Sequence, residues 1–65
     1  MYLNLEVEML KKKIKKEEIA TTIGKTLNTL RQKMIGTSSF TYDEVVKIQE
    51  TFFQNYDLKE LFKNE

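Results

Sequence analysis

The feature that most constrains this chain is the stretch 14–36, IKKEEIATTIGKTLNTLRQKMIG, in which one glycine separates two short amphipathic segments. When they are wound as helices, the first segment turns Ile19 inward and the second turns Leu30 inward. Gly24 stands between them, at a helix end that favours a residue able to adopt the left-handed conformation. Two short helices joined by so tight a turn form a helix-turn-helix, which the pattern predicts over about residues 16–35.

The rest of the chain also favours helix, because it contains no proline and only two glycines, Gly24 and Gly36. Thr26 is a good N-cap residue, and Thr41 with Glu44 has the spacing of a capping box. From these signals, five helices are predicted over residues 2–13, 16–22, 27–35, 42–54 and 58–62. The predicted fold is a compact all-α domain of five helices.

In the first predicted helix, apolar residues recur at intervals of four, three and four: Leu3, Val7, Leu10 and Ile14. Such spacing lines one face of a helix. We therefore expect this stripe to face the core, with Leu5 and Met9 beside it.

Most aromatic side chains lie in the C-terminal half: Phe40, Phe52, Phe53, Tyr56 and Phe62. A small helical domain has a thin core and needs large side chains to fill it, so we expect these residues to be core. One or two of them could instead form a dimer surface, because so short a chain cannot readily cover five aromatics.

Composition excludes several classes of protein. The 65 residues allow one domain, residues 1–65, and include neither cysteine nor histidine. No disulfide or thiolate zinc site can therefore form, and the commonest general base and metal ligand is missing. We expect no enzyme activity, cofactor or metal site, because the chain has little room for a ligand cleft. Its apolar runs are far too short to span a membrane, so a soluble intracellular protein is expected.

Charge is unevenly distributed along the chain, although the net charge is only +1. Residues 11–36 carry eight Lys/Arg against two Glu, whereas residues 1–10 and 37–65 are both net acidic. A local excess of positive charge is what a phosphate-binding segment shows. A lysine-rich, solvated surface with no ligand would give the same composition.

In the third predicted helix, polar side chains point away from the inward direction of Leu30. At 100° per residue, Asn28 and Gln32 point directly outward, and Arg31 lies on their flank. Asn and Gln amides can form bidentate bonds with adenine, an Arg guanidinium can do so with guanine, and Leu27 could contact a thymine methyl. These four residues are the candidate base-reading set, although any solvent-facing helix can carry such residues.

The order of these residues resembles the lambda-repressor-like, Cro/repressor-type helix-turn-helix family. The family pattern is matched by Ile14, the polar run 15–18, Ile19-Ala20, Gly24, Thr26, Thr29-Leu30 and Gly36. The chain is also similar to small phage-derived regulators of Gram-positive bacteria, through Asn4, Leu5, Glu8, Met9, Phe40-Thr41, Asp43-Glu44, Lys47-Ile48, Thr51-Phe52-Phe53 and Leu61-Phe62. Nearly the whole chain is covered by this resemblance.

The resemblance implies a lambda-repressor-like DNA-binding domain whose second and third helices form the helix-turn-helix. The third helix, residues 27–35, would lie in the major groove of a double-stranded operator and regulate transcription. The base-reading positions of the family fall on Leu27, Asn28, Arg31 and Gln32. Its phosphate contacts fall on Lys16, Lys25, Thr26, Thr29 and Ser38. A homodimer on a palindromic operator follows, in the cytoplasm of a bacterial host and associated with its nucleoid.

The chain departs from the family at three positions. Lys16 stands where many members have Gln, which keeps a phosphate contact possible but changes its geometry. Leu27 replaces a frequent polar residue and removes one hydrogen-bonded base contact. Lys33 occupies a position that is apolar in many members, and Met34 is expected to take over its packing.

Two alternatives to DNA reading remain open at the level of sequence. The first is a protein-interaction module with a helix-turn-helix fold, whose partner is another phage repressor that it modulates. The weak net charge, the acidic segment 37–65 and the apolar Leu27 favour this alternative. The second is the antitoxin of a toxin–antitoxin pair, in which one fold serves both roles.

Overall fold

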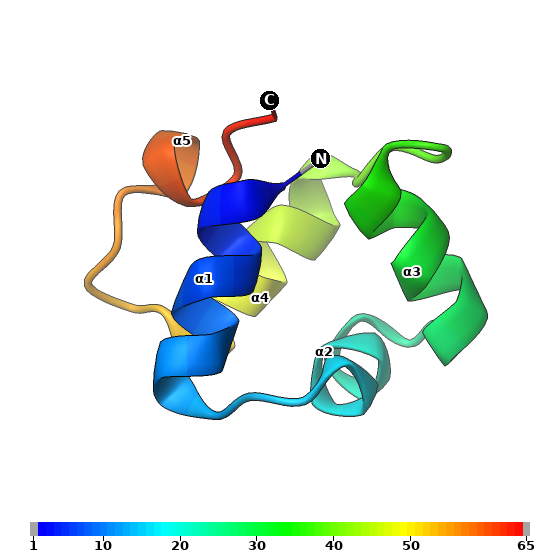
Figure 1. Ribbon diagram of the computed structural model, residues 1–65, viewed down its shortest axis with the longest axis horizontal. Helices are drawn as coiled ribbons and strands as arrows, with labels where there is room; N and C mark the ends of the chain where they lie inside the picture. The colour runs from blue at the N-terminus through cyan, green and yellow to red at the C-terminus, as the bar shows by residue number, and fades with distance from the viewer. Residues whose placement is uncertain (1, 65) are drawn as a thin grey trace.

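Five α-helices follow one another in a computed structural model, which describes residues 2–64 (Figure 1). Their bounds are α1 Leu3–Lys12, α2 Lys16–Ile23, α3 Leu27–Ile35, α4 Tyr42–Phe52 and α5 Leu58–Leu61. The radius of gyration over Cα atoms is 10.5 Å. The predicted all-α class with five helices is confirmed, and within the described residues no helix has the length and apolarity needed to cross a bilayer.

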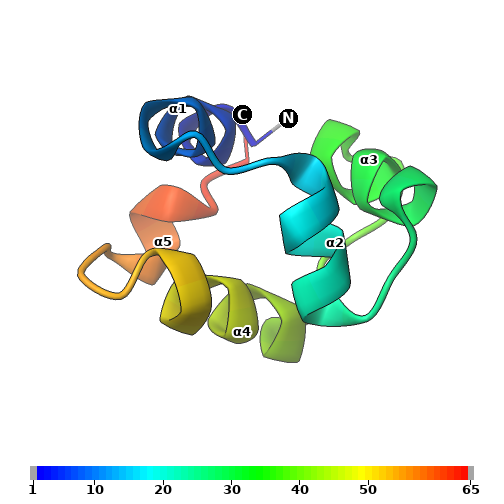
Figure 2. The same cartoon turned by 90° about the horizontal axis from the view of Figure 1, so that it is seen from below.

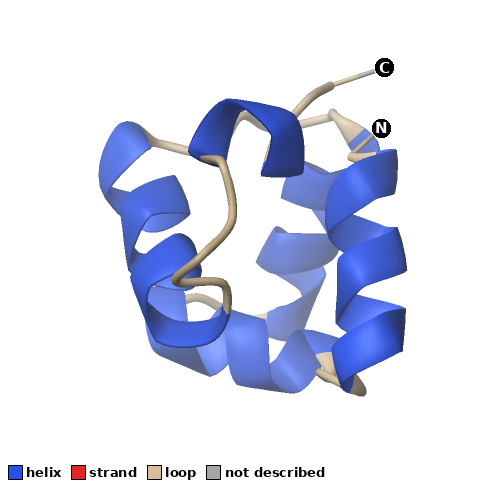
Figure 3. Ribbon diagram, turned by 90° about the vertical axis from the view of Figure 1, so that its left-hand side faces the viewer, coloured by secondary structure: helices blue, strands red, loops and turns tan. Residues whose placement is uncertain are grey.

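The helices surround a single core (Figure 2). Helix α2 packs against α3 and α4, while α5 packs against both α1 and α4. Figure 3 shows the described chain as helices joined by loops. The described ends of the chain lie near each other, with 6.3 Å between the ring centroids of Tyr2 and Phe62. The backbone N–H of Tyr2 also donates to the carbonyl of Met34 on α3. The buried apolar side chains come from all five helices and the segment after α4: Leu5, Met9, Ile19, Ala20, Leu30, Met34, Ile48, Phe53 and Leu61.

The predicted helix ends around the central turn are confirmed. Helix α3 has its predicted bounds, with Thr26 as N-cap and Gly36 as a left-handed C-cap at φ 94°. Gly24 ends α2 in the left-handed conformation at φ 70°. The capping box of Thr41 and Glu44 opens α4, with Glu44 accepting from the Thr41 N–H at 2.9 Å. Short polar signals in the sequence therefore set these boundaries locally.

The predicted inner face of α1 is wrong. The fully buried residue of α1 is Leu5, with Met9 4% exposed, whereas Leu3, Val7 and Leu10 are 48%, 38% and 79% exposed. Lys12 continues the row of Leu5 and Met9 along the helix but is itself exposed. Because this position holds a lysine, apolar periodicity does not identify the row.

Lys12 is exposed, but its long side chain reaches across to the segment after α4. Its Nζ atom lies 5.6 Å from the centroid of the Phe53 ring and 5.3 Å from that of Tyr56, and it donates to the carbonyl of Phe52. The Tyr56 hydroxyl donates to Glu8 at 2.8 Å. These contacts between α1 and the 52–56 segment accompany the burial of Leu5 and Met9, rather than Leu10, in the core.

The same contacts explain why α4 ends at Phe52 and not at the predicted residue 54. Phe53 leaves the helical conformation and is fully buried, so the chain must turn there to insert its ring into the core. Gln49 then donates from its side chain to the carbonyl of Tyr56. The end of α4 depends on tertiary contacts, and the sequence has no glycine or proline there that would predict it.

Aromatic residues fill the core region as predicted, but to different depths. Phe53 is fully buried and meets the Tyr56 ring edge-on at 5.2 Å. Phe40, Phe52, Tyr56 and Phe62 are only partly buried against the core. Tyr2 joins Phe40 and Phe62 in a cluster of edge-to-face rings, which attaches the N-terminal segment to the end of the chain.

Candidate nucleic-acid interface

Helix α3 presents a mainly polar face outward, with Ile35 62% exposed at its C-terminal end, and an apolar face inward. Leu30 is fully buried and Met34 nearly so, and they attach the helix to the core. Asn28, Arg31 and Gln32 are all exposed. Because these residues are spaced by three and four, they share one side of the helix. Figure 1 shows α3 at the edge of the molecule, with its outer side turned away from α1 and α4.

The start of α3 is held in place by a compact set of hydrogen bonds. The Thr26 hydroxyl accepts from the Thr29 N–H at 3.2 Å and donates to the Thr29 hydroxyl at 3.0 Å. The Lys25 N–H donates to the Ala20 carbonyl at 2.9 Å, which fixes the turn after α2. Thr26 and Thr29, two predicted phosphate contacts, therefore already bond each other and cap the helix. Lys25 is exposed beside them.

At the end of α3, backbone N–H groups of the following loop donate to a carbonyl of the helix, so they do not point toward a phosphate outside. The N–H groups of Thr37 and Ser38 both donate to the Gln32 carbonyl, at 2.9 and 3.2 Å. The half-buried Ser38 is thus near the candidate interface, and its hydroxyl is the group it would offer to a phosphate. Gly36 makes this tight reversal possible, because its φ of 94° is unfavourable for residues with a Cβ.

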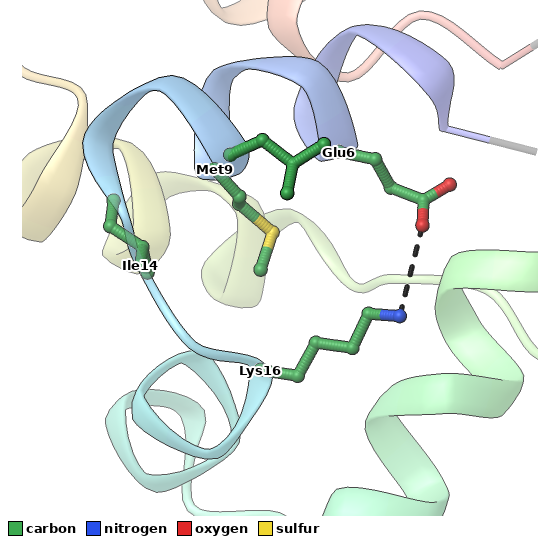
Figure 4. A pocket seen from close by; sticks show the side chains of 5 residues that line it. Glu6, Met9, Ile14 and Lys16 are labelled. Carbon is green, nitrogen blue, oxygen red and sulfur yellow. Dashed lines mark ion pairs between the residues drawn. The ribbon is translucent and has the colours of Figure 1, made fainter.

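Lys16 lies apart from the exposed face of α3. It is the first residue of α2, and its Nζ atom is 3.7 Å from Glu6 Oε1 on α1 (Figure 4). Glu18 fixes the start of this helix by accepting from the Lys15 N–H at 3.0 Å, which compensates for the absence of a capping side chain at Lys15. A phosphate at Lys16 would have to compete with the Glu6 carboxylate.

Leu27, the fourth predicted base-reading residue, is half-buried. It occupies the first turn of α3, one turn before Arg31. The structure thus brings Asn28, Arg31 and Gln32 together on an exposed face and leaves Leu27 at its inner border.

The role of Lys33 was the hardest to predict from the sequence. Its side chain is buried and its Nζ atom lies 3.0 Å from Glu44 Oε1, 2.9 Å from the Ser39 carbonyl and 5.9 Å from the Phe40 ring centroid. It therefore joins the end of α3 to the start of α4. The spacing of three from Leu30 was the available signal, since this spacing places Lys33 on the inward side of α3.

The environment of Glu44 favours its charged form. Burial by itself raises the pKa of Glu44, but the hydrogen bond from the Thr41 N–H and the Lys33 ammonium outweigh it. The pKa of Glu44 is therefore lowered from its usual value of 4.5, and Lys25 contributes to this at longer range. The ion pair and the capping box thus share one carboxylate.

The cationic residues of segment 11–36 are close in sequence but lie on different sides of the folded chain. Lys11 pairs with Glu8 at 3.4 Å, and Lys12 lies over aromatic rings at the C-terminal end of α1. Figures 1 and 2 show this end of α1 on the opposite side of the molecule from α3. Around α3 the exposed cations are Lys25 and Arg31. The local positive field at α3 is therefore weaker than the total of residues 11–36 indicates.

These contacts leave a clear candidate surface: an exposed amide and guanidinium face on a helix with both ends fixed, and a lysine beside its start. No protein-family model, curated protein or solved structure matches this chain.

Proposed function

We propose that this chain is a sequence-specific regulator of transcription, a helix-turn-helix domain of the lambda-repressor-like type that reads double-stranded DNA. The observation that carries the proposal is the exposed face of α3, where Asn28, Arg31 and Gln32 project from one side of a helix anchored by Leu30. Their amide and guanidinium groups match the donor and acceptor pattern of purine edges in the major groove.

Affinity and selectivity would come from different residues. Lys25 beside the start of α3 would contact phosphate, release counterions and make binding depend on salt. Asn28, Arg31 and Gln32 would supply the choice of sequence. One short helix reads only a few base pairs, so a useful operator would contain two half-sites. A dimer would place them about 34–36 Å apart, or at a multiple of this distance.

Replacing Gln32 and Lys25 separately tests this division. We expect Gln32→Ala to weaken binding to the preferred site by about 1–3 kcal/mol and to relax selectivity at one or two base pairs. We expect Lys25→Ala to weaken binding to all duplexes alike and to lower the slope of log K against log salt by about 1. Fluorescence anisotropy on specific and random duplexes at several salt concentrations measures both effects.

Lys47→Ala is the matched control, because Lys47 is an exposed lysine on α4 and not on α2 or α3. We expect it to leave affinity and salt slope nearly unchanged. Equal losses from Lys25→Ala and Lys47→Ala would mean that the protein attracts DNA by general charge alone.

A second candidate function is a protein-interaction module that modulates a repressor, or the antitoxin of a toxin–antitoxin pair. Three cations of residues 11–36, namely Lys11, Lys16 and Lys33, are already in ion pairs within the chain, which favours this candidate. The half-buried, apolar Leu27 on the border of the α3 face favours it too. A chain that fails to retard any duplex but co-purifies with a second regulator would support this function over the first.

A further inference from the structure

Helix α1 has an apolar stripe on its outer side. We call Leu3, Val7 and Leu10 the outer stripe; they are 48%, 38% and 79% exposed. At 100° per residue, they fall within about 60° of one another, opposite the buried Leu5 and Met9. Isolated exposed apolar residues are ordinary, but three in one row on one short helix form a contiguous surface.

A pocket adjoins the outer stripe. Leu10, Met9 and Ile14 line a hollow of about 150 Å³ between α1 and the start of α2, with Glu6 and Lys16 at its edge (Figure 4). Leu10 belongs to both the stripe and the pocket. A helix laid along the stripe could therefore also insert an apolar side chain into the pocket.

The two flanks of the outer stripe carry different polar residues. Glu6 lies on one flank, and Asn4 and Lys11 lie on the other. Lys13 directly follows α1 as its left-handed C-cap at φ 57°, and the helical backbone before it places its Cα on the Glu6 flank, about 20° from Glu6 around the axis. Lys13 takes part in none of the ion pairs found within residues 2–64. Glu6 is 3.7 Å from Lys16 through one oxygen, so its second oxygen remains for another cation.

We propose that a second copy of this chain covers the outer stripe, through antiparallel pairing of the two α1 helices about a twofold axis. In this arrangement Val7 of each copy packs on Leu10 of the other. Leu3 of each copy enters the pocket beside Ile14 of the other. The pairing is self-complementary, because each copy supplies both an inserted Leu3 and a pocket that receives the Leu3 of the other.

Charge complementarity selects a second copy over an unrelated apolar helix. In an antiparallel pair that sets Val7 against Leu10, the adjoining flank sets Glu6 of each copy against Lys13 of the other. The twofold axis repeats this contact, so two Glu–Lys pairs border the apolar row. The other flank sets Asn4 against Lys11, which brings no like charges together.

The same geometry orients the candidate DNA-reading helices. In an antiparallel pair the twofold axis is perpendicular to the plane of the two α1 helices, so a given flank of both helices faces the same side. The contact between Glu6 and Lys16 puts α2 on the Glu6 flank, and the hydrogen bond from Asn4 to the Glu60 carbonyl puts α5 on the other. Helix α3 lies on the same side of α1 as α2 (Figure 2), so both copies present α2 and α3 on one side of the dimer.

The interface deepens the proposed function, which calls for a dimer, but it rests on α1 and can be tested without DNA. Helix α1 is only about 15 Å long, so the pair buries less than the roughly 800 Å² per partner of a standard interface. We therefore expect a weak dimer, with a Kd on the order of 100 µM, in the range of transient associations.

Sedimentation equilibrium of the full chain without DNA, from low micromolar to millimolar concentration, measures this association. We expect the average mass to rise from monomer toward dimer. We expect Leu10→Gln to raise the Kd at least tenfold, and Tyr42→Ser, a change at an apolar residue that is 73% exposed on α4, to leave it unchanged. A monomer at millimolar concentration, or equal effects of the two variants, would overturn the proposal.

Cysteine variants test the orientation, because the natural chain contains no cysteine. When Val7→Cys and Leu10→Cys proteins are mixed and oxidised, we expect mixed disulfides to exceed the statistical share. Leu3→Cys alone should not crosslink, because an antiparallel pair keeps the two copies of residue 3 about 16 Å apart, beyond the roughly 7 Å limit of a disulfide. Efficient crosslinking of Leu3→Cys would indicate a parallel pair and contradict the proposal.

The two proposals can fail separately. A dimer that uses the outer stripe but shows no DNA preference would retain this inference and overturn the proposed function. A protein that selects DNA, yet stays monomeric and is insensitive to Leu10→Gln, would retain the function and overturn the interface.

Discussion

Leu5→Ala is expected to lower the free energy of unfolding by about 3 kcal/mol, whereas Leu10→Ala should change it by less than about 0.5 kcal/mol. Leu5 is fully buried in the core, and Leu10 is 79% exposed on the same helix. Truncation at Leu5 loses the transfer free energy and leaves a cavity, and truncation at Leu10 does neither. A domain of this size is stable by about 3–10 kcal/mol, so the first variant would lose much of its stability.

Urea unfolding followed by circular dichroism, at low micromolar protein where the chain is monomeric, measures both changes. The pair is internally matched, because both substitutions remove the same atoms from one helix and have the same helix propensity. A larger loss at Leu10 than at Leu5 would mean that α1 buries the stripe that the sequence periodicity predicted, and that the α1 orientation described above is wrong.

Lys33→Met is expected to lower the free energy of unfolding by about 2–3 kcal/mol, even though methionine is the more apolar residue. The cause is the partner left behind: Glu44 would remain charged, with about 9% of its side chain exposed and no ammonium 3.0 Å away. The bond from Lys33 to the Ser39 carbonyl, which connects α3 to the following loop, would also be lost.

The double variant Lys33→Met with Glu44→Gln is the control for this prediction. A glutamine can still accept the Thr41 N–H, so the cap of α4 is kept while the unpaired charge is removed. We expect it to recover about 1 kcal/mol or more relative to Lys33→Met alone. If the stability losses of the two single substitutions simply add in the double variant, the ion pair contributes nothing to stability. A Lys33→Met protein as stable as the wild type would show the same.

The Glu44 carboxylate also predicts a dependence of stability on pH. Its pKa in the folded protein is lowered from 4.5, so its contribution is fully present above that value. The contribution is lost as the pH falls through the lower, folded-state pKa, because the unfolded chain then binds the proton more tightly. Thermal unfolding between about pH 6 and pH 3 should therefore show a smaller loss for Glu44→Gln than for the wild type. Parallel curves for the two proteins would contradict this.

The parts of the fold that were predicted correctly depend on local chemistry. Helix α3 begins after Thr26 and ends before Gly36 because a hydroxyl and a left-handed glycine act within a few residues of where they stand. The exposed side of Asn28, Arg31 and Gln32 follows equally directly, because helical spacing relates them to the buried Leu30.

The parts that were missed depend on contacts distant in sequence. On α1, Glu8 and Lys12 contact Tyr56 and the residues just after α4, beside the row of the buried Leu5 and Met9. Glu8 and Lys12 are both charged, so apolar periodicity alone favours the wrong row. The end of α4 at Phe52 has the same origin, since the burial of Phe53 ends it.

The candidate phosphate contacts show the same limit. Lys16 has the right residue type at a helix start, yet its partner in the folded chain is Glu6 on α1. The loop amides of Thr37 and Ser38 are already bonded to the end of α3. No local sequence pattern predicts that groups within the chain compete with phosphate for Lys16 and for the loop amides, because this competition arises only when the helices pack together.

Selection from a pool of random double-stranded DNA by the purified protein tests whether α3 reads sequence. We expect enrichment of a symmetric site with two half-sites whose purines suit Asn28, Arg31 and Gln32, and loss of that enrichment in Gln32→Ala at one or two positions of each half-site. A pool whose composition stays random after repeated selection would contradict it and leave α3 without the role of reading DNA.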